Sequence, residues 1–305
     1  MNVAVILVNY NSNEDTIECV RSLSNSTIKP FIIIVDNNSI NKNIHEQINF
    51  YDHVKVIYNN ANLGFGRANN VGITWTLANT KTEYLFILNN DTIVEINTLE
   101  TLIKPFFIDS KIGISTCKIV FANDSKMIWY GGGQIDLKRG KPKITDFKKQ
   151  STQEGAEKSR YVDFASGCAM MFKRDILKKI KGFDERMFMY VEDLELCMRL
   201  KKNDYKIWYT ADTKILHKVH ASIGGLNNNL PALHPKNPHL NFYVYHMTKN
   251  LLLTMNKHLT KLEWSRFLLN YSIFMGYKNF LYFINERYKA NRAFFKAVLD
   301  FYNKK

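Results

Sequence analysis

The sequence has few cysteines, no basic leader and no long apolar run, and each of these absences argues against one class of protein. The four cysteines, Cys19, Cys117, Cys168 and Cys197, form no C-x-x-C pair, as expected of small buried residues in a reducing compartment. The first apolar run ends at Asn9, which is too short for a signal peptide with its cleavage site. No stretch approaches the ~20 apolar residues of a membrane span. We therefore expect a cytoplasmic protein, either soluble or peripheral at the inner face of the cell membrane.

Positive charge and aromatic residues are concentrated in the last part of the chain. The formal net charge is +14, and positions 241–305 hold 11 Lys and Arg against 3 Asp and Glu. The same positions hold 16 of the 40 Phe, Tyr and Trp residues. A basic, aromatic segment can bind nucleic acid or an anionic membrane surface, or can simply pack with its basic face solvated. No nucleic-acid motif accompanies the charge, so we expect an anionic membrane and no nucleic acid as partner.

Four apolar runs in the first hundred residues predict a parallel sheet, with strands at 3–8, 31–35, 54–58 and 84–87. Open α/β sheets bind their ligands at the carboxyl ends of the strands. Polar residues follow three of these runs, namely Asn9-Tyr10-Asn11-Ser12, Asp36-Asn37-Asn38-Ser39 and Leu88-Asn89-Asn90-Asp91-Thr92. We interpret Asp91 as a metal ligand. The alternative is a strand-end turn, because Asn and Asp are ordinary turn formers.

A glycine-rich segment follows the third predicted strand and leads into a helix. It comprises Asn62-Leu63-Gly64-Phe65-Gly66-Arg67-Ala68-Asn69-Asn70-Val71-Gly72. Glycines allow the backbone to approach a ligand closely, and the amino end of a helix favours an anion. The spacing is not G-x-G-x-x-G and the segment does not follow the first strand, so a dinucleotide-binding Rossmann site is disfavoured. An ordinary glycine-rich turn remains the alternative.

The second half of the chain has weaker patterns. Residues 138–160 are polar and basic, which predicts a mobile loop, and the segment from Asn241 onward is expected to be helical. Further strands are predicted at 113–121, 164–172, 205–209 and 214–216, with helices at 174–180 and from Glu192 onward.

Two adjacent acids begin the helix that starts at Glu192. Helical spacing places Asp193 on the apolar side and Glu192 toward the charged side, where Glu195 also lies. A first-turn carboxylate that is aimed inward and held ionised by the helix dipole suits a general base. The alternative is a pair of acids that merely favour a helix terminus. Downstream, His217 and His220 could be ligands, although a single hydrogen-bonded histidine is commoner.

In their order, these motifs resemble the inverting nucleotide-sugar glycosyltransferases of family 2, and most closely the rhamnosyltransferase-like members. The resemblance covers about residues 1–225, from Val5-Ile6-Leu7-Val8 to the segment His217 to Ser222. It implies an α/β, Rossmann-like glycosyltransferase A fold with a mixed central sheet flanked by helices, plus a helical C-terminal extension. The implied catalytic domain spans 1–235, with a nucleotide-binding half at 1–110 and an acceptor half at 111–235. The basic aromatic extension then spans 236–305.

The resemblance also implies roles for individual residues. Asp91 takes the place of the metal-binding acid of the family's D-x-D element and would hold Mg²⁺ or Mn²⁺ together with His217. Asp193 takes the place of the catalytic base, beside Glu192. Asp36 would accept the N3–H of a uracil or thymine ring. The implied donor-binding residues are Asn9, Tyr10, Asn11, Asp36, Asn38, Gly64, Arg67, Asn70, Asn89 and Asn90.

The implied reaction is the metal-dependent, inverting transfer of a sugar, with rhamnose as one candidate, from a UDP- or dTDP-sugar. The acceptor would be a glycan or a lipid-linked saccharide in the assembly of a bacterial-type surface polysaccharide. One alternative is a sugar nucleotidyltransferase, although its Gly-rich phosphate loop is missing after the first strand. The other is a non-catalytic protein that binds a membrane or nucleic acid through the basic extension. A processive synthase is disfavoured because no Gln-x-x-Arg-Trp follows Glu192-Asp193.

Overall fold

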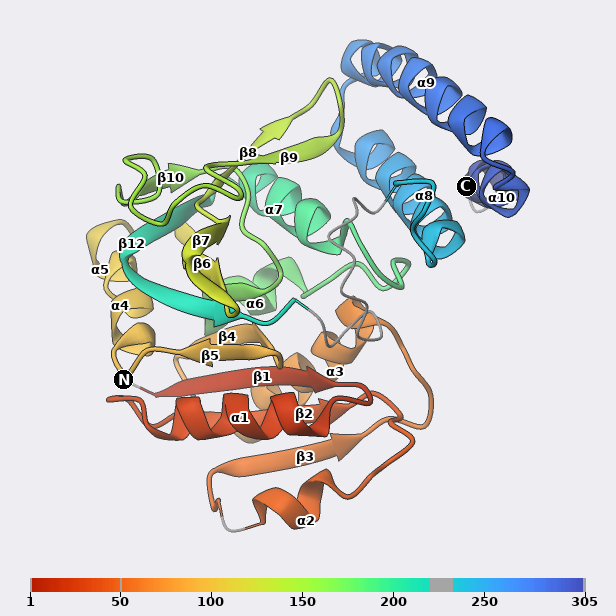
Figure 1. Ribbon diagram of the computed structural model, residues 1–305. Coiled ribbons are helices and arrows are strands. Elements are labelled where there is room, and N and C mark those ends of the chain that lie inside the picture. Colours follow the sequence, from red (N-terminus) through yellow and green to blue (C-terminus); the bar gives the residue numbers. More distant parts are fainter. Residues whose placement is uncertain (1, 50, 220–232, 304–305) are drawn as a thin grey trace.

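The computed structural model describes residues 2–49, 51–219 and 233–303, and a mixed sheet of ten strands runs through this part of the chain (Figure 1). The main path of the sheet is β10 (Arg160–Val162), β12 (Lys206–His217), β6 (Ile112–Phe121), β11 (Ala169–Lys173), β4 (Tyr84–Asn89), β1 (Val3–Asn9), β2 (Phe31–Asp36) and β3 (Val54–Tyr58). Two further strands pair at its side, β5 (Thr92–Val94) with β12 and β7 (Asp124–Tyr130) with β6. A separate hairpin joins β8 (Gly133–Asp136) and β9 (Lys141–Ile144).

The strands β1 to β4 form the parallel half of the sheet, as predicted. The apolar runs of β1, β2 and β4 are buried on both faces, since residues such as Ile6, Ile33 and Phe86 are 0% exposed, whereas the residues of β3 at the end of the sheet are half-buried or exposed. The register pairs Asn9 with Asp36 and Val8 with Asn89. The polar residues that end these strands therefore lie side by side at one edge of the sheet.

Helices pack on the sheet and complete the α/β architecture. Residue Gly72 allows α3 to approach β1 and β2, because a Cβ at this position would lie 2.6 Å from Ile6 Cγ2. The helices that precede the C-terminal region are α1 (Asn13–Ser24), α2 (Ile44–Ile48), α3 (Phe65–Asn79), α4 (Thr98–Ile103), α5 (Pro105–Ile108), α6 (Arg174–Ile180) and α7 (Glu192–Lys202).

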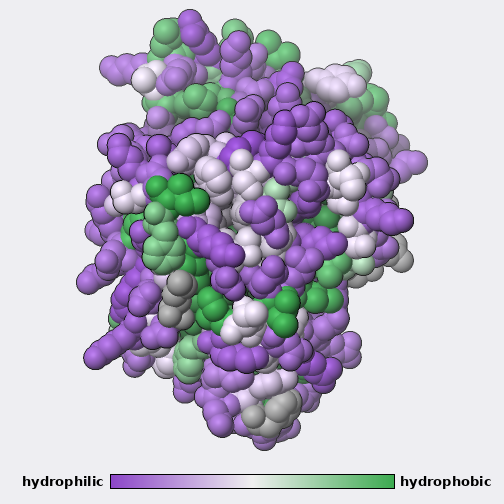
Figure 2. Space-filling model, turned by 90° about the vertical axis from the view of Figure 1, so that its left-hand side faces the viewer, coloured by the Kyte–Doolittle hydropathy of each residue, from purple (hydrophilic) through white to green (hydrophobic). Residues whose placement is uncertain are grey.

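Three helices form the C-terminal region, namely α8 (Leu240–His258), α9 (Lys261–Ile284) and α10 (Tyr288–Asn303). Helix α8 packs beside α7, and α9 and α10 pack on α8 (Figure 1, blue); this region buries Phe267, Tyr271 and Phe301 in the same apolar cluster as the sheet. The helical extension therefore shares its core with the α/β part. Within the described ranges, no helix has both the length and the apolar character that crossing a bilayer requires. The molecular face shown in Figure 2 is mostly hydrophilic, with hydrophobic residues in small separate groups.

The fold class is as predicted, but several local predictions are wrong. The strand expected at 164–172 begins only at Ala169, and those expected at 205–209 and 214–216 are one strand, β12, with a register shift between Thr210 and Lys214. The predicted loop at 138–160 contains β9, whose sequence Lys141-Pro142-Lys143-Ile144 alternates exposed and half-buried residues. An edge hairpin of this kind needs no continuous apolar run, which is why composition missed it.

Candidate active site

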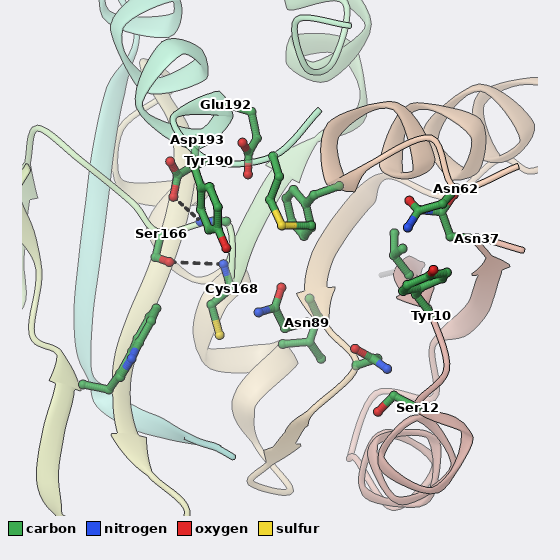
Figure 3. Close-up of a pocket in the computed structure, with 17 residues that line it drawn as sticks. Tyr10, Ser12, Asn37, Asn62, Asn89, Ser166, Cys168, Tyr190, Glu192 and Asp193 are labelled. Carbon is green, nitrogen blue, oxygen red and sulfur yellow. Dashed lines mark hydrogen bonds between the residues drawn. The ribbon is translucent and has the colours of Figure 1, made fainter. Parts of the chain in front are cut away.

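A cavity of about 260 Å³ opens where the parallel strands end and α7 begins (Figure 3). Tyr10 and Ser12 reach it after β1, Asn37 reaches it after β2, and Asn89 reaches it at the end of β4. Asp193 enters from the first turn of α7. The polar residues that follow β1, β2 and β4 and the acid pair that begins α7 therefore meet at one cavity.

Beneath one side of this cavity lies a layer of buried polar side chains. Asn9 and Asp36 are 0% exposed, and Asn9 Nδ2 donates a hydrogen bond to Asp36 Oδ2 at 2.7 Å. Asp36 Oδ1 accepts from the backbone N–H of Ser39, whose hydroxyl accepts from the N–H of Asn11. Asn11 and Asn38 both have left-handed backbone, with φ of 54° and 67°. Of Asn9, Tyr10, Asn11, Asp36 and Asn38, all predicted to bind the donor, only Tyr10 lines the cavity.

Asparagines that the sequence did not single out form the wall next to this layer. Asn37 Nδ2 donates to Asn62 Oδ1 at 2.8 Å, and Asn37 Oδ1 accepts from Asn59 Nδ2 at 3.1 Å and from the N–H of Leu63 at 3.0 Å. Asn62 Oδ1 also accepts from the N–H of Gly64. This network fixes the glycine-rich turn against the end of β2. Both Asn37 and Asn62 lie within the motifs quoted from the sequence, so these motifs could have identified them as candidate site residues.

Three predicted donor-binding residues of the glycine-rich segment do not line the cavity. Gly64 has a φ of 80°, and a Cβ there would lie 1.9 Å from the carbonyl oxygen of Phe188. Arg67 is exposed on the first turn of α3. Asn70 donates to the carbonyl of Phe183 at 2.9 Å and accepts from its N–H at 2.8 Å. In this structure Asn70 therefore holds the loop after α6.

The predicted metal residues lie behind the end of β4. Asn89 and Asn90 line the cavity, whereas Asp91 and His217 are 1% and 5% exposed. The pairing of β5 with β12 sets His217 opposite Thr92, so that His217 Nε2 lies 3.2 Å from Asp91 Oδ1 and 3.5 Å from Asn89 Nδ2. A buried carboxylate and an imidazole nitrogen at this spacing form a donor pair that fits a divalent cation.

Only part of a coordination shell is present at this position. Residues 2–49, 51–219 and 233–303 contain no group of three or more His, Cys, Asp and Glu side chains that could hold a metal ion. The other predicted histidine, His220, lies outside the described residues, as do Ala221 and Ser222 of the same motif.

The acid pair is oriented differently from the prediction. Glu192 is the more buried of the two, and its Oε2 has no hydrogen-bond partner among the described residues, while Asp193 is half-buried. Asp193 Oδ1 accepts from the N–H of Leu194 at 2.8 Å and Oδ2 from the N–H of Gly167 at 3.2 Å. Burial, with the neighbouring Asp193 carboxylate, raises the pKa of Glu192 to about 8, and burial also raises the pKa of Asp193.

The surroundings of the two carboxyl groups favour different protonation forms. Two backbone N–H groups stabilise the ionised form of Asp193, whereas the neighbouring charge and burial favour the protonated form of Glu192. The hydrogen bonds therefore favour Asp193 as the member of the pair that ionises first. The sequence predicts that the helix dipole holds this first-turn acid ionised, and in the structure burial acts in the opposite direction by raising the pKa of Asp193.

Several residues that line the cavity had no assigned role. The ring of Trp129, on β7, lies edge-on to His217, with centroids 4.6 Å apart. The backbone N–H of Gly167 was also missed, because a strand was predicted where the structure has the turn before β11. This turn directs the N–H toward Asp193. The lining residues that the sequence did not assign are Val8, Ser12, Asn37, Asn62, Phe65, Leu88, Trp129, Ser166, Gly167, Cys168, Met189 and Tyr190.

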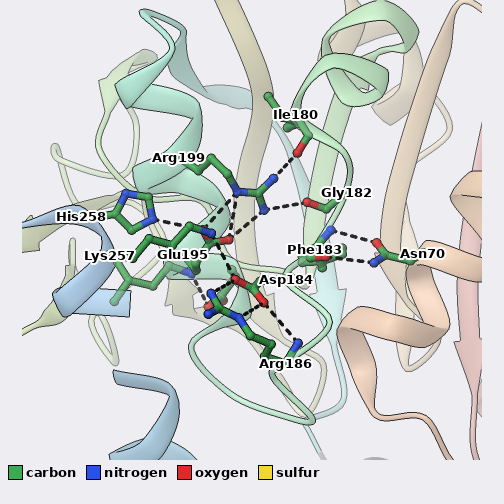
Figure 4. A network of polar contacts seen from close by, with 12 residues as sticks. Asn70, Ile180, Gly182, Phe183, Asp184, Arg186, Glu195, Arg199, Lys257 and His258 are labelled. Carbon is green, nitrogen blue, oxygen red and sulfur yellow. Dashed lines mark hydrogen bonds and ion pairs between the residues drawn. The ribbon is translucent and has the colours of Figure 1, made fainter. Parts of the chain in front are cut away.

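A buried ionic network lies behind α7 (Figure 4). The carboxylate of Glu195, 0% exposed, contacts Arg199 Nη2 at 2.8 Å, Lys257 Nζ at 2.7 Å and His258 Nε2 at 3.1 Å. Lys257 also reaches Asp184 at 3.1 Å. Burial alone would raise the pKa of Glu195, but His258, Arg199 and Lys257 together hold it at about 2. The charged face predicted for this helix is therefore covered by α8.

Comparison with known proteins places the chain in a family. The model of glycosyl transferase family 2 matches residues 4–181, which is more than half of the chain. The rhamnosyltransferase WbbL of Escherichia coli is 25% identical over 230 residues, or 72% of this chain and 84% of WbbL. The N-acetylglucosaminyl-diphospho-decaprenol L-rhamnosyltransferase of Mycobacterium tuberculosis is 25% identical over 264 residues, or 79% of this chain and 82% of that protein.

Solved structures show the same fold at lower identity. GalNAc-T7, crystallised with UDP, GalNAc and Mn²⁺, superposes with a TM-score of 0.61 at 18% identity, over 81% of this chain and 48% of its own. The mannosyltransferase PcManGT from Pyrobaculum calidifontis, in complex with GDP-Man and Mn²⁺, gives 0.56 at 12% identity, over 100% of this chain and 88% of its own. With the mixed sheet and the strand-end cavity described above, the chain belongs to glycosyl transferase family 2 and is a glycosyltransferase of the glycosyltransferase A fold.

Proposed function

We propose that this glycosyltransferase moves a sugar, with inversion, from a pyrimidine nucleoside diphosphate donor to a glycan or lipid-linked saccharide of a surface polysaccharide. The observation that carries the proposal is the cavity that holds both the strand-end amides of Asn89 and Asn90 and the acid pair Glu192 and Asp193. Rhamnose is the favoured sugar because two relatives are named rhamnosyltransferases. A lipid-linked acceptor agrees with the decaprenol-linked substrate in the name of one of them.

Asp193 is the proposed catalytic base. Its carboxylate takes the proton of an acceptor hydroxyl, whose oxygen forms a bond to the anomeric carbon of the donor sugar. The bond between that carbon and the diphosphate oxygen breaks in the same step, and the diphosphate leaves with the electron pair. Attack and departure occur on opposite faces, so the anomeric configuration inverts. Glu192, protonated at neutral pH, keeps the pair at one negative charge beside the reacting atoms.

The donor side is proposed to read the pyrimidine ring through Asp36. Each oxygen of this carboxylate accepts one hydrogen bond from the protein and keeps a second lone pair for the N3–H of uracil or thymine. Tyr10 and Asn37 line the cavity on the same side and would contact the nucleoside. Asp36, Arg67 and Asn70 do not line the cavity, so all three remain proposed donor contacts on the resemblance.

Asp91 and His217 are proposed to hold Mg²⁺ or Mn²⁺. When bound, the cation would offset negative charge on the departing diphosphate. One carboxylate and one imidazole are a small protein contribution, so metal affinity without nucleotide should be weak. An imidazole nitrogen suits Mn²⁺ better than the harder Mg²⁺, so we favour Mn²⁺.

A screen of nucleotide sugars for transfer and hydrolysis with each cation tests the proposed function. A UDP- or dTDP-sugar should be consumed and a purine nucleotide sugar should not. Asp193→Asn should abolish transfer but spare donor binding, and near-normal turnover by this variant would refute the base assignment. Asp91→Ala should weaken metal-dependent nucleotide binding in calorimetry. An unchanged affinity would remove Asp91 from the metal site.

The outer faces of α9 and α10 are proposed to attach the enzyme to an anionic membrane at the cytoplasmic side. Opposite the buried Phe267 and Tyr271, α9 exposes a stripe of large apolar residues, and α10 exposes a second stripe beside basic residues. Exposed apolar surface of this extent, next to positive charge, suits a lipid interface. The stripe residues are Leu262, Leu269, Ile273, Tyr277, Phe280 and Ile284 on α9, and Tyr288, Phe295, Leu299 and Tyr302 on α10, with Lys289, Arg292 and Lys296 beside them.

Co-sedimentation of the full chain with vesicles tests this attachment. Binding should be strong with anionic lipid at low salt and weak with neutral lipid, and Leu269→Glu with Phe280→Glu should reduce it. A gel shift with nucleic acid should show no complex. If the unmodified protein stays in the supernatant with anionic vesicles, the attachment is refuted.

A further inference from the structure

The segment Phe188–Val191, which leads into α7, has a backbone that needs support from its surroundings. Tyr190 and Val191 have φ of 68° and 73°, in the left-handed region. A β-branched residue seldom adopts this conformation, and it persists only where the neighbouring structure enforces it. Because Glu192 and Asp193 follow directly, this turn decides the direction in which the acid pair enters the cavity.

The hydrogen bonds that support the turn come from α8. Asn250 is 0% exposed, and its Nδ2 donates to the carbonyl oxygens of Met189 and Tyr190, both at 2.9 Å. One primary amide with two N–H groups satisfies both carbonyls at once, which an apolar or hydroxyl side chain of similar size cannot do. The two carbonyls belong to residues that themselves line the cavity.

Aromatic contacts from α8 and a hydrogen bond from α3 hold the same segment. The ring of Tyr190 stacks on Tyr243 with centroids 4.9 Å apart, and the ring of Phe188 packs against His246 at 5.3 Å. From the other side, the N–H of Phe65 at the start of α3 donates to the carbonyl of Phe188 at 3.0 Å. The turn is thus clamped between the nucleotide-binding half and the C-terminal helices.

We propose that Asn250 is a positioning residue for glycosyl transfer, which fixes the strained turn at Tyr190 and Val191 and so sets the acid pair in the cavity. This inference rests on the proposed function of Asp193. Helix α8 belongs to the segment predicted as a C-terminal extension. With this role for Asn250, α8 becomes a supporting part of the active site. The amide itself touches neither donor nor acceptor, because Asn250 does not line the cavity.

The test compares Asn250→Leu, which keeps the branched shape of the side chain but removes both donors, with Thr254→Val one turn further along α8. Thr254 is a matched control because it is also 0% exposed and its hydroxyl has no hydrogen-bond partner within the described ranges. Three quantities are measured on the full chain: kcat for transfer, the donor dissociation constant by calorimetry, and the pH profile of kcat.

We expect Asn250→Leu to lower kcat by about tenfold to a hundredfold, as for a small displacement of a catalytic group, with an unchanged donor dissociation constant. The acid side of its pH profile should move to lower pH, because a loosened turn admits water to the buried pair. The titratable neighbours Tyr190, Cys168 and Cys197 all have raised pKa values and stay neutral in this range. Thr254→Val should match the unmodified enzyme in all three quantities.

Equal kcat values and pH profiles for the two variants would overturn the inference. If Asn250→Leu does not fold, Tyr243→Leu removes the stacked ring and carries the same expectation. Failure of the proposed function is distinguishable, because the unmodified enzyme would then transfer no sugar or Asp193→Asn would remain active.

Discussion

The Glu195 network offers a quantitative prediction about stability. Glu195→Gln keeps the shape of the side chain but removes the charge that faces Arg199, Lys257 and His258. The pKa of Glu195 is about 2 in the folded protein, against an ordinary 4.5. At about 1.4 kcal/mol per pKa unit, this difference corresponds to about 3 kcal/mol of folding free energy at neutral pH. Removing one partner of a buried pair also leaves cations uncompensated, which costs a similar amount.

The sign of the pH dependence follows from the lowered pKa of Glu195. Its stabilisation is fully present above pH 4.5 and is lost as the pH falls toward 2. Between pH 7 and pH 3, about 2 kcal/mol of the difference between the unmodified protein and Glu195→Gln should disappear. Urea unfolding of both proteins across this range measures the difference directly.

The matched control for this experiment is Glu154→Gln. Glu154 also pairs with a lysine, Lys158, but its side chain is 82% exposed. Solvent screens such a pair, so this variant should unfold like the unmodified protein at every pH. A stability difference for Glu195→Gln that is absent, or that stays constant from pH 7 to pH 3, would refute the account of the network.

Further predictions concern the active site, two glycines and the thiols. Because the pKa of Glu192 is raised to about 8, Glu192→Gln resembles the protonated form and should keep most of the activity at pH 7 in initial-rate assays, unlike Asp193→Asn; equal loss in both variants would contradict the division of roles. Gly64→Ala should destabilise the protein by more than about 1 kcal/mol in urea unfolding, because φ is 80° and Phe188 blocks the Cβ. Gly276→Ala, where a Cβ meets no atom within 4 Å, should instead stabilise α9 by about 0.5–1 kcal/mol. Burial raises the pKa of Cys19 to about 12 and raises those of the other three thiols, so an aromatic disulfide reagent should label the protein only after unfolding, and rapid labelling of the native state would refute this.

The features that depend on the local pattern of residues could be predicted from the sequence. Continuous apolar runs predicted β1 to β4, and the parallel arrangement then placed Asn9, Asp36 and Asn89 at one edge of the sheet. The acid pair was also found, because a helix start with two acids has a recognisable pattern. These features require only residue spacing and the geometry of an α/β sheet.

Features that depend on distant packing could not be predicted in the same way. Helical spacing put Glu195 on a charged face, but no pattern indicates that α8 covers this face with Lys257 and His258. The left-handed turn at Tyr190 and Val191 is equally hidden, because its support comes from a residue about sixty positions later. Spacing along one helix carries no information about the helix that packs against it.

The shared core of the sheet and the C-terminal helices has a consequence for synthesis of the protein. Val3 and Phe301 belong to one apolar cluster, so the first strand and the last helix are partners in the same core. When the ribosome has produced the parallel strands and the acid pair, the turn at Tyr190 and Val191 still lacks its hydrogen bonds from α8. A chain truncated before α8 should therefore lack the hydrogen bonds that support this turn, and also Phe267, Tyr271 and Phe301 of the shared core.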